Sequence, residues 1–280
     1  MKIVTTIFEM RSLIGSLRRE GKSIGFVPTM GFLHEGHLSL MRTARQVNDI
    51  VVASIFVNPA QFGPQEDLAR YPRDAEGDRR KCGSVGVDVL FMPTVAEMYP
   101  QQPAVFVTVE GLSDILEGAV RPGHFRGVAT VVAKLFNIVQ PNRAYFGQKD
   151  YQQCAVIKRM VRDLDLDVEI SVLPTMREAD GLAMSSRNSY LDAEQRTKAA
   201  GLYRALQAGQ ELVRSGAREP EKVKQKMRAV IAQEKGVEID YVEAADPDDL
   251  SPLETIKDRI VLLVAVRIGS TRLIDNLLIL

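Results

Sequence analysis

Apolar residues recur every three or four positions near the start of the chain, which predicts an amphipathic helix. Thr6 and Glu9 have the spacing of a capping box, and apolar side chains follow at positions 7, 10, 13, 14 and 17. We expect the helix to end near Arg19, because Gly21 follows it.

Short apolar runs then alternate with helical patterns over residues 24–173. The run at 50–57 is almost continuously apolar, which is typical of a strand covered on both faces and therefore central in its sheet. Strands alternating with helices predict an α/β fold with a doubly wound parallel sheet, whose ligands bind at the carboxyl ends of the strands. The predicted strands are 24–27, 50–57, 87–92, 105–109, 144–146 and 168–173, and the main helices are centred on 38–44 and cover 125–139 and 152–164.

The pattern changes beyond Pro174. A loop rich in Gly, Ser and Arg covers 177–188, and Asp192 caps a helix that is predicted to reach Arg214. A second helix starts at Pro220, and strands are predicted at 237–243 and 260–268. Helices followed by strands without strict alternation are typical of a smaller α+β domain. We therefore expect two domains, residues 1–175 and residues 176–280.

Composition narrows the class of protein. The 280 residues are 45% hydrophobic and 26% charged, as in ordinary globular proteins, and 36 basic residues balance 36 acidic ones. A net charge of zero argues against a protein that mainly neutralises nucleic acid. Cys82 and Cys154 form no CxxC pair, which predicts neither a disulfide framework nor a cysteine zinc site. The apolar run 260–266 is too short to span a bilayer, and Glu9 interrupts any signal-peptide core, so we expect a cytoplasmic protein.

His34 and His37 lie between the first long strand and its helix. Main-chain N–H groups and a partial positive charge at a helix start favour anions, and Gly31 and Gly36 allow a tight turn there. Two imidazoles three residues apart can share one face and bind the same phosphate. A metal pair and an inert pair of histidines are the alternatives, although no HExxH spacing is present.

Three further segments carry candidate chemistry. Lys149 follows strand 144–146 at a helix start, where a cation is unfavourable unless an anion is also bound. Taken alone, this residue is better explained as a solvated surface lysine, because most lysines are surface charges. The loop 177–188 could clamp phosphate oxygens through its hydroxyls and Arg187, or could be a polar linker. The segments 56–63 and 121–127 suit a small polar substrate, although turn chemistry explains them as well. The chain contains no GxxxxGK[ST], GxSxG or strand-associated GxGxxG motif, which argues against kinases, esterases and dehydrogenases.

The segments PTMGFLHEGH, FVNPAQFG, RPGHFRGVATVV, FGQKDYQQ and READGLAMSSRN, in this order, and AVRIGSTRLIDN near the C-terminus resemble the pantothenate synthetase (pantoate–β-alanine ligase) family. The resemblance extends over essentially the whole chain. It implies a Rossmann-like first domain, a smaller domain that closes over the active site, and a cytoplasmic homodimer. It also implies membership of the HIGH-type nucleotidyl-transfer superfamily, which includes the class I aminoacyl-tRNA synthetases.

The same resemblance implies roles for individual residues. His34 and His37 match an HxGH signature that contacts the ATP phosphates, and Lys149 matches a lysine that holds phosphate oxygens as the adenylate forms. These three are the predicted catalytic residues. The implied further ATP contacts are Met30, Gly147, Asp150, Met184, Ser185, Ser186 and Arg187, of which the last three match the counterpart of the KMSKS loop. The implied pantoate-binding amides are Asn58, Gln61 and Gln153, while Arg121 and His124 line the site without an assigned role.

The implied reaction is an ATP-dependent condensation of pantoate with β-alanine through a pantoyl adenylate. Mg²⁺ is expected with ATP, and no side chain is assigned as a metal ligand. Glu76 and Asp78 could help to hold magnesium, but an exposed helix face explains them as well. The alternatives are another adenylyl-transferring enzyme of the superfamily or a catalytically silent nucleotide-binding protein. The neutral charge counts against a tRNA-dependent version, and neither nucleic acid nor membrane is expected as a partner.

Overall fold

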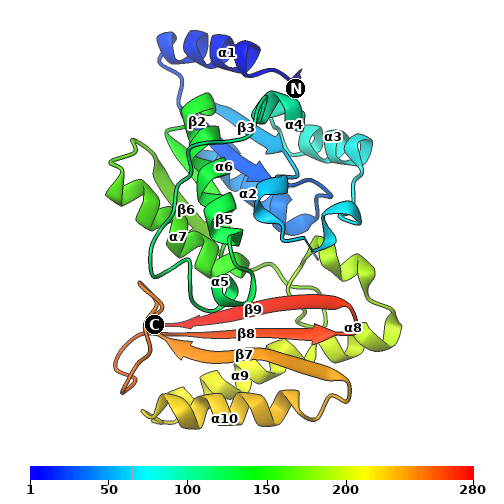
Figure 1. The fold of residues 1–280 in the computed structure, drawn as a ribbon, viewed down its shortest axis with the longest axis vertical. Helices are drawn as coiled ribbons and strands as arrows, with labels where there is room; N and C mark the ends of the chain where they lie inside the picture. Colours follow the sequence, from blue (N-terminus) through cyan, green and yellow to red (C-terminus); the bar gives the residue numbers. More distant parts are fainter. Residues whose placement is uncertain (65) are drawn as a thin grey trace. The chain divides into compact units, whose positions relative to one another are not determined.

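Figure 1 shows the computed structural model, which describes residues 1–64 and 66–280. The chain divides into two units. The first contains Met1–Gly147 and Gln153–Leu173, and the second contains Gln148–Gln152 and Pro174–Leu280. The short segment Gln148–Gln152 thus groups with the second unit, although the sequence pattern placed it inside the first domain.

The first unit is built on a parallel sheet, which confirms the predicted doubly wound α/β fold. Its strand order is β1-β4-β3-β2-β5-β6, so the apolar strand β3 is central, as its composition predicts. The strands are β1 (Lys2–Val4), β2 (Ile24–Thr29), β3 (Ile50–Ile55), β4 (Val89–Phe91), β5 (Arg143–Gly147) and β6 (Glu169–Leu173). The strand order reverses between β2 and β5, which pair directly, and ligands bind outside the carboxyl ends of strands at such a switch point.

Helices cover this sheet. Thr6 caps α1 by accepting a hydrogen bond from the Glu9 N–H at 3.2 Å, and the helix ends at Arg19, as predicted. Helix α2 buries Met41 and Ala44 against the sheet, where Val51 and Tyr145 belong to the same apolar cluster. The helices are α1 (Ile7–Arg19), α2 (Glu35–Val47), α3 (Ala75–Ser84), α4 (Val95–Met98), α5 (Glu117–Val120), α6 (His124–Val139) and α7 (Tyr151–Asp163), with 3-10 helices η1 (Pro59–Gln61) and η2 (Asp67–Ala69).

The strand expected at 105–109 is wrong, because this segment is irregular. Val105 is 80% exposed, and the Val107 N–H donates to Thr130 Oγ1 at 2.9 Å instead of to a neighbouring strand. The Arg126 guanidinium lies 3.6 Å from the centre of the Phe106 ring. Residues 105–109 therefore contact Thr130 and Arg126 of α6, in place of the neighbouring strand that their apolar, β-branched composition predicts.

The second unit contains an antiparallel sheet of order β7-β8-β9, packed against helices as the predicted α+β pattern requires. Leu206, Met227 and Leu262 belong to its apolar core. The helix predicted from 192 to 214 is two helices, since α8 ends at Ala199 and α9 starts at Gly201. The elements are 3-10 helices η3 (Gln148–Asp150) and η4 (Ser186–Tyr190), helices α8 (Ala193–Ala199), α9 (Gly201–Arg214) and α10 (Pro220–Ile231), and strands β7 (Val237–Ala245), β8 (Ile260–Ile268) and β9 (Thr271–Ile279).

Strand β9 lay outside the predicted elements. Two polar residues in succession, Asp275 and Asn276, interrupt the alternation that marks a strand, yet both side chains are buried. Among the described residues, none of the helices combines the length and the apolarity that are needed to cross a bilayer.

Candidate active site

The loop after β2 carries the two histidines. His34 is the N-cap residue of α2, and His37 lies in the first turn of the helix. The centres of their rings are 4.1 Å apart. The main-chain N–H of His34 donates to His37 Nδ1 at 3.3 Å, so a neutral His37 carries its proton on Nε2. The two imidazoles therefore lie together at the start of a 13-residue helix, where the helix dipole favours an anion.

Gly31 allows this loop to turn. Its φ is 84°, and the following Phe32 is also in the left-handed region, at 50°. A Cβ atom at position 31 would lie 2.9 Å from Ile55 Cγ2 and 3.0 Å from Asp78 Oδ2. Both the backbone angle and the lack of space therefore require glycine at this position.

Asp78 holds the same loop from helix α3. Its side chain is buried and accepts from the N–H groups of Phe32 at 2.8 Å and Leu33 at 2.7 Å. Lys81 Nζ donates to the Leu33 carbonyl at 2.7 Å. Of the two interpretations of this acidic stretch, the exposed helix face is wrong for Asp78, which is buried, and fits Glu76, which is exposed and pairs with Arg80. Sequence reasoning missed this contact because the carboxylate and the loop are 45 residues apart.

The described residues offer no group of three or more His, Cys, Asp and Glu side chains that could hold a metal ion. Both cysteines are free and buried. Burial raises the pKa of the Cys82 thiol to about 12, so it stays protonated at neutral pH.

Asn58 organises the segment after β3. Its Oδ1 accepts from the Ala60 N–H at 3.3 Å and from the Tyr99 hydroxyl at 2.9 Å. Its Nδ2 donates to Gln61 Oε1 at 3.0 Å and to the Gly127 carbonyl at 3.2 Å. Burial raises the pKa of Tyr99 to about 12, which keeps its hydroxyl a donor. Both amide hydrogens of Asn58 are thus committed to partners within the protein.

Gln61 keeps a more adaptable donor. Its Nε2 faces the Met30 thioether at 3.4 Å, and a thioether sulfur is a weak acceptor that a substrate oxygen can replace. Helix α6 packs directly behind this segment, since a Cβ on Gly127 would lie 2.3 Å from the Ala60 carbonyl oxygen. Gly127 is therefore needed for the close approach of the helix to η1.

His124, at the start of α6, also fixes Gln61. Its Nδ1 lies 2.8 Å from the Gln61 carbonyl, which can only accept, so Nδ1 carries the proton. Nε2 then accepts from Arg121 Nη1 at 3.0 Å, while Arg121 binds Glu66 through Nε at 2.9 Å and Nη2 at 2.5 Å. Burial, and secondly the Arg121 charge, lower the pKa of His124 to about 4. His124 is therefore neutral at physiological pH.

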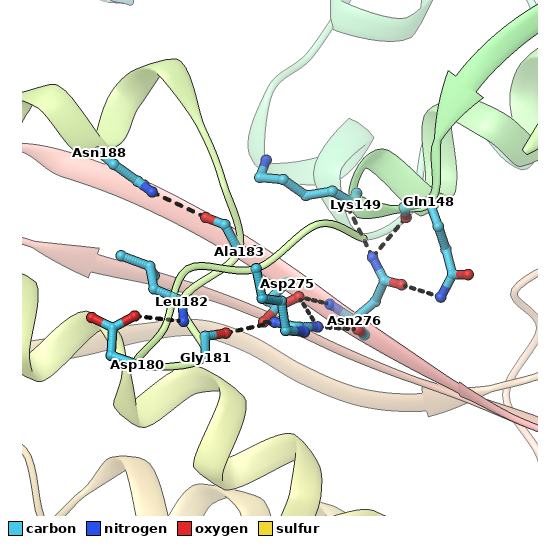
Figure 2. A network of polar contacts seen from close by, with 10 residues as sticks. Gln148, Lys149, Asp180, Gly181, Leu182, Ala183, Asn188, Asp275 and Asn276 are labelled. Atoms are coloured by element: carbon cyan, nitrogen blue, oxygen red, sulfur yellow. Dashed lines mark hydrogen bonds and ion pairs between the residues drawn. The ribbon is translucent and has the colours of Figure 1, made fainter. Parts of the chain in front are cut away.

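Lys149 lies in the second unit, in the single turn of η3. Its side chain is 20% exposed, and its Nζ lies 3.5 Å from Asp150 Oδ1. The main-chain carbonyls of Gln148 and Lys149 both accept from Asn276 Nδ2 of β9, as Figure 2 shows. The Lys149 side chain therefore extends from a turn whose main-chain carbonyls accept hydrogen bonds from the buried Asn276 amide.

The loop 177–188 is an ordered structure and not a linker. Residues 176–184 form a small hairpin, in which the Glu178 N–H donates to the Leu182 carbonyl at 2.8 Å. Asn188 Nδ2 donates to Glu178 Oε1 at 2.9 Å and to the Ala183 carbonyl at 3.0 Å. Ser185 then caps η4, since its Oγ accepts from the Arg187 N–H at 3.2 Å.

A buried ion pair fastens the hairpin to β9. Arg177 Nη1 and Nη2 donate to the two carboxylate oxygens of Asp275 at 2.6 and 2.9 Å, and Nη1 also reaches the Gly181 carbonyl at 3.0 Å. The guanidinium carbon lies 3.9 Å from the centre of the Tyr203 ring. Burial raises the pKa of Asp275, and the hydrogen bonds from Arg177 act in the opposite direction.

The predicted site residues thus fall into separate groups. Hydrogen bonds join Met30, Gln61 and Asn58 in the first unit, and ring contact joins the two histidines. Gly147 ends β5, and Gln153 is half-buried in α7. The second unit contains Lys149 and Asp150 in η3, and Met184, Ser185, Ser186 and Arg187 in the loop leading into η4.

Comparisons with known proteins cover the full length of the chain. The family model described as pantoate-beta-alanine ligase matches residues 2–278. The pantothenate synthetase of Moorella thermoacetica is 58% identical over 279 residues, which is 100% of this chain and 99% of that protein. The pantothenate synthetase of Thermotoga petrophila is 54% identical over 276 residues, covering 99% of each chain.

Solved structures agree with these matches. The crystal structure of pantothenate synthetase from Thermus thermophilus has a TM-score of 0.94 at 52% identity and covers 99% of each chain. A pantoate-beta-alanine ligase from Francisella tularensis, crystallised with beta-gamma ATP and beta-alanine, has a TM-score of 0.81 at 38% identity. That alignment covers 99% of this chain and 97% of the other.

Proposed function

Because the chain belongs to the pantoate–β-alanine ligase family, we propose that it condenses pantoate with β-alanine and converts ATP to AMP and pyrophosphate. The observation that carries this proposal is the family match over residues 2–278, which includes every segment with candidate chemistry. The Francisella tularensis relative crystallised with an ATP compound and beta-alanine supports the same substrates here.

The reaction proceeds in two steps. A carboxylate oxygen of pantoate attacks the α-phosphorus of ATP, a new C–O–P linkage forms, and pyrophosphate leaves. The amine of β-alanine then attacks the acyl carbon of the pantoyl adenylate. The C–O bond breaks, AMP leaves with that oxygen, and the amine loses a proton as the amide forms. The enzyme forms no covalent bond of its own, so catalysis rests on alignment and on stabilising negative charge.

The cationic and hydrogen-bonding groups supply this stabilisation. His34 and His37 bind phosphate oxygens at the start of α2, and Lys149 holds oxygens around the α-phosphorus as the adenylate forms. Ser185, Ser186 and Arg187 bind the β- and γ-phosphates. Further nucleotide contacts come from Met30, Gly147, Asp150 and Met184. The loop 184–187 shields the adenylate from water when it closes.

Magnesium enters with the nucleotide. Mg²⁺ is usually bound through substrate phosphates and only one or two carboxylates, and it retains several waters. No side chain is assigned as a ligand of this metal, and we propose that the ATP phosphates hold it. When bound with ATP, the ion would neutralise charge on the triphosphate and make pyrophosphate a better leaving group.

Neutral amides recognise pantoate. Gln61 and Gln153 bind the substrate, and Gln61 does so through Nε2, which faces only a weak thioether acceptor. Asn58 orients Gln61 by donating a hydrogen bond to Gln61 Oε1. Recognition by amides avoids a tight salt bridge to the carboxylate, which must remain nucleophilic. Asn58 acts on pantoate through Gln61, because its own amide hydrogens are bound to Gln61 and Gly127.

We also propose that the protein works in the cytoplasm as a homodimer, with residues 1–175 binding ATP and pantoate and residues 176–280 closing over them. These proposals rest on the family resemblance. Light scattering would give a mass of twice 31.1 kDa for the homodimer and 31.1 kDa for a monomer.

The test is AMP formation with each substrate omitted in turn. We expect AMP only when ATP, pantoate and β-alanine are all present in multiple-turnover conditions. Product that depends on tRNA favours a different adenylyl transferase, and tight ATP binding without turnover favours a silent nucleotide-binding protein. Either result contradicts the proposed function.

Residue roles are tested by pantoate-dependent ATP–pyrophosphate exchange. His34→Ala and Lys149→Ala should each lower exchange by about 100- to 1,000-fold and leave a small residual rate and an intact fold, because each removes a group that stabilises negative charge at the triphosphate. Lys158→Ala is the matched control, since Lys158 is an exposed lysine of α7. Near-normal exchange in either of the first two variants would refute its assigned role.

A further inference from the structure

Strand β9 presents a buried amide to the backbone that carries Lys149. Asn276 is 1% exposed, and its Nδ2 donates to the carbonyl oxygens of Gln148 at 2.9 Å and Lys149 at 2.8 Å. Its Oδ1 accepts from Gln148 Nε2 at 3.3 Å. Carbonyl oxygens only accept, so this arrangement fixes which end of the amide faces η3 (Figure 2).

The neighbouring residue binds the other phosphate-binding segment of this unit. Asp275 is 3% exposed and holds Arg177, which in turn donates to the Gly181 carbonyl of the hairpin that leads to Ser185. Successive side chains of a strand point to opposite faces, and here both are buried. Strand β9 is thus covered on both faces at this point. Asp275 on one face binds Arg177, and Asn276 on the other binds the carbonyls of Gln148 and Lys149.

We propose that Asn276 is a positioning residue for Lys149, and that Asp275 and Asn276 together set the two phosphate-binding segments of this unit on one strand. The inference rests on the proposed function, in which Lys149 stabilises the adenylation transition state. A buried polar group left without its partners is costly, so the amide and the two carbonyls favour one arrangement of the turn.

The role is one of positioning because Asn276 has no hydrogen left for a substrate. Both of its N–H bonds are directed at main-chain carbonyls, one of them that of Lys149 itself. The 3-10 helix η3 has only three residues, and so short a turn depends on outside contacts for its geometry. A misplacement of about 1 Å in a catalytic group can cost about 100-fold in rate.

The direct test is Asn276→Asp. This variant keeps the shape of the side chain but replaces the donor with an oxygen that repels the two carbonyls. We expect kcat for pantoate-dependent ATP–pyrophosphate exchange to fall about tenfold or more, with KM for pantoate within about twofold of wild type. Asn137→Asp is the matched control, because Asn137 of α6 is exposed although its Nδ2 also donates to a carbonyl, that of Ala133 at 2.8 Å.

A double-mutant cycle with Lys149→Ala separates positioning from a general structural effect. If Asn276 acts through Lys149, then Asn276→Asp should not lower further the residual exchange of Lys149→Ala. The proposal is overturned if Asn276→Asp lowers the rate by the same factor in both backgrounds. It is also overturned if the single variant exchanges at the wild-type rate.

Gln148→Ala provides a second variant that does not depend on burying a new charge. Gln148 is only half-buried, and its loss removes the donor that orients Asn276. We expect a smaller fall, about threefold, that is again absent in the Lys149→Ala background. This variant decides the question if thermal unfolding shows that Asn276→Asp does not fold, and an unchanged rate would then refute the proposal. Wild type and Asn137→Asp must catalyse exchange in either case, and their failure would refute the proposed function instead.

Discussion

His124 is held between a carbonyl and a guanidinium, and this fixes its protonation state. The Gln61 carbonyl requires a proton on Nδ1, and Arg121 requires a lone pair on Nε2. A protonated ring would also be buried beside the Arg121 cation. The residue therefore serves as a neutral support for Gln61, a role that the sequence left unassigned.

The lowered pKa of His124 makes stability depend on pH. With a folded pKa of about 4 and an unfolded pKa of about 6.5, the unfolded chain binds a proton first as the pH falls. The free energy of unfolding therefore decreases between pH 6.5 and pH 4, on the order of 2 kcal/mol by pH 5. His124→Gln removes this titration. In urea unfolding, the decrease in the free energy of unfolding between about pH 7.5 and pH 5 should therefore be about 2 kcal/mol smaller for the variant than for the wild type. Equal losses in the two proteins would contradict the assignment.

Asp78 gives a second prediction for a single side chain. Asp78→Asn leaves one carbonyl oxygen for the N–H groups of Phe32 and Leu33, so about 1.5–3 kcal/mol of the free energy of unfolding should be lost. KM for ATP should rise, because the histidine loop is less well held. Glu76→Gln, at an exposed position of the same helix, should change stability by about 0.5 kcal/mol or less. Equal stability of the two variants would show that Asp78 does not hold the loop.

The spacing of residues along the chain predicted contacts between near neighbours in the site, but not contacts between residues far apart in the sequence. Two histidines three residues apart at a helix start must lie near each other, and their rings do. Nothing local shows that Asp78 binds a loop 45 residues away, or that Asn276 binds the carbonyl of Lys149. Such contacts depend on the topology of each unit, which the sequence pattern gives only in outline.

At the scale of elements, the hydrophobic pattern predicted a strand correctly where the strand is apolar and buried on both faces. The central strand β3 is buried on both faces and was predicted from its unbroken apolar run. The segment 105–109 has a similar composition but lies beside α6, where Thr130 accepts a hydrogen bond from the Val107 N–H. Strand β9 is the opposite exception, a strand that the pattern did not predict. Its buried polar residues, Asp275 and Asn276, interrupt the alternation of apolar and polar positions that marks a strand. Tertiary partners decide both exceptions.

The Arg177–Asp275 pair gives a prediction at this scale. Asp275→Asn leaves a guanidinium that is largely buried without its counter-charge, so the free energy of unfolding should fall by about 3 kcal/mol. Asp248→Asn breaks an exposed pair with Arg259 in the same unit, and its effect should be about 1 kcal/mol or less. Urea unfolding of both variants compares the two pairs. A similar small loss in both would mean that the buried pair does not hold the hairpin.

At the scale of the whole molecule, the composition excluded classes of protein but did not identify a reaction. Balanced charge and an ordinary hydrophobic content are shared by many α/β enzymes. The ordered set of motifs along the full chain identified the family, and the match over residues 2–278 agrees with it. The grouping of Gln148–Gln152 with the second unit was not foreseen, because the segment is continuous with β5 in the sequence.

The central claim is that the pantoate carboxylate attacks the α-phosphorus of ATP. Pantoate labelled with ¹⁸O in its carboxylate tests this directly when the products of complete turnover are analysed by mass spectrometry. The pantoyl adenylate route predicts one labelled oxygen in each AMP, because the C–O bond is the one that breaks when β-alanine attacks. Label in phosphate or pyrophosphate, or AMP without label, would contradict the account.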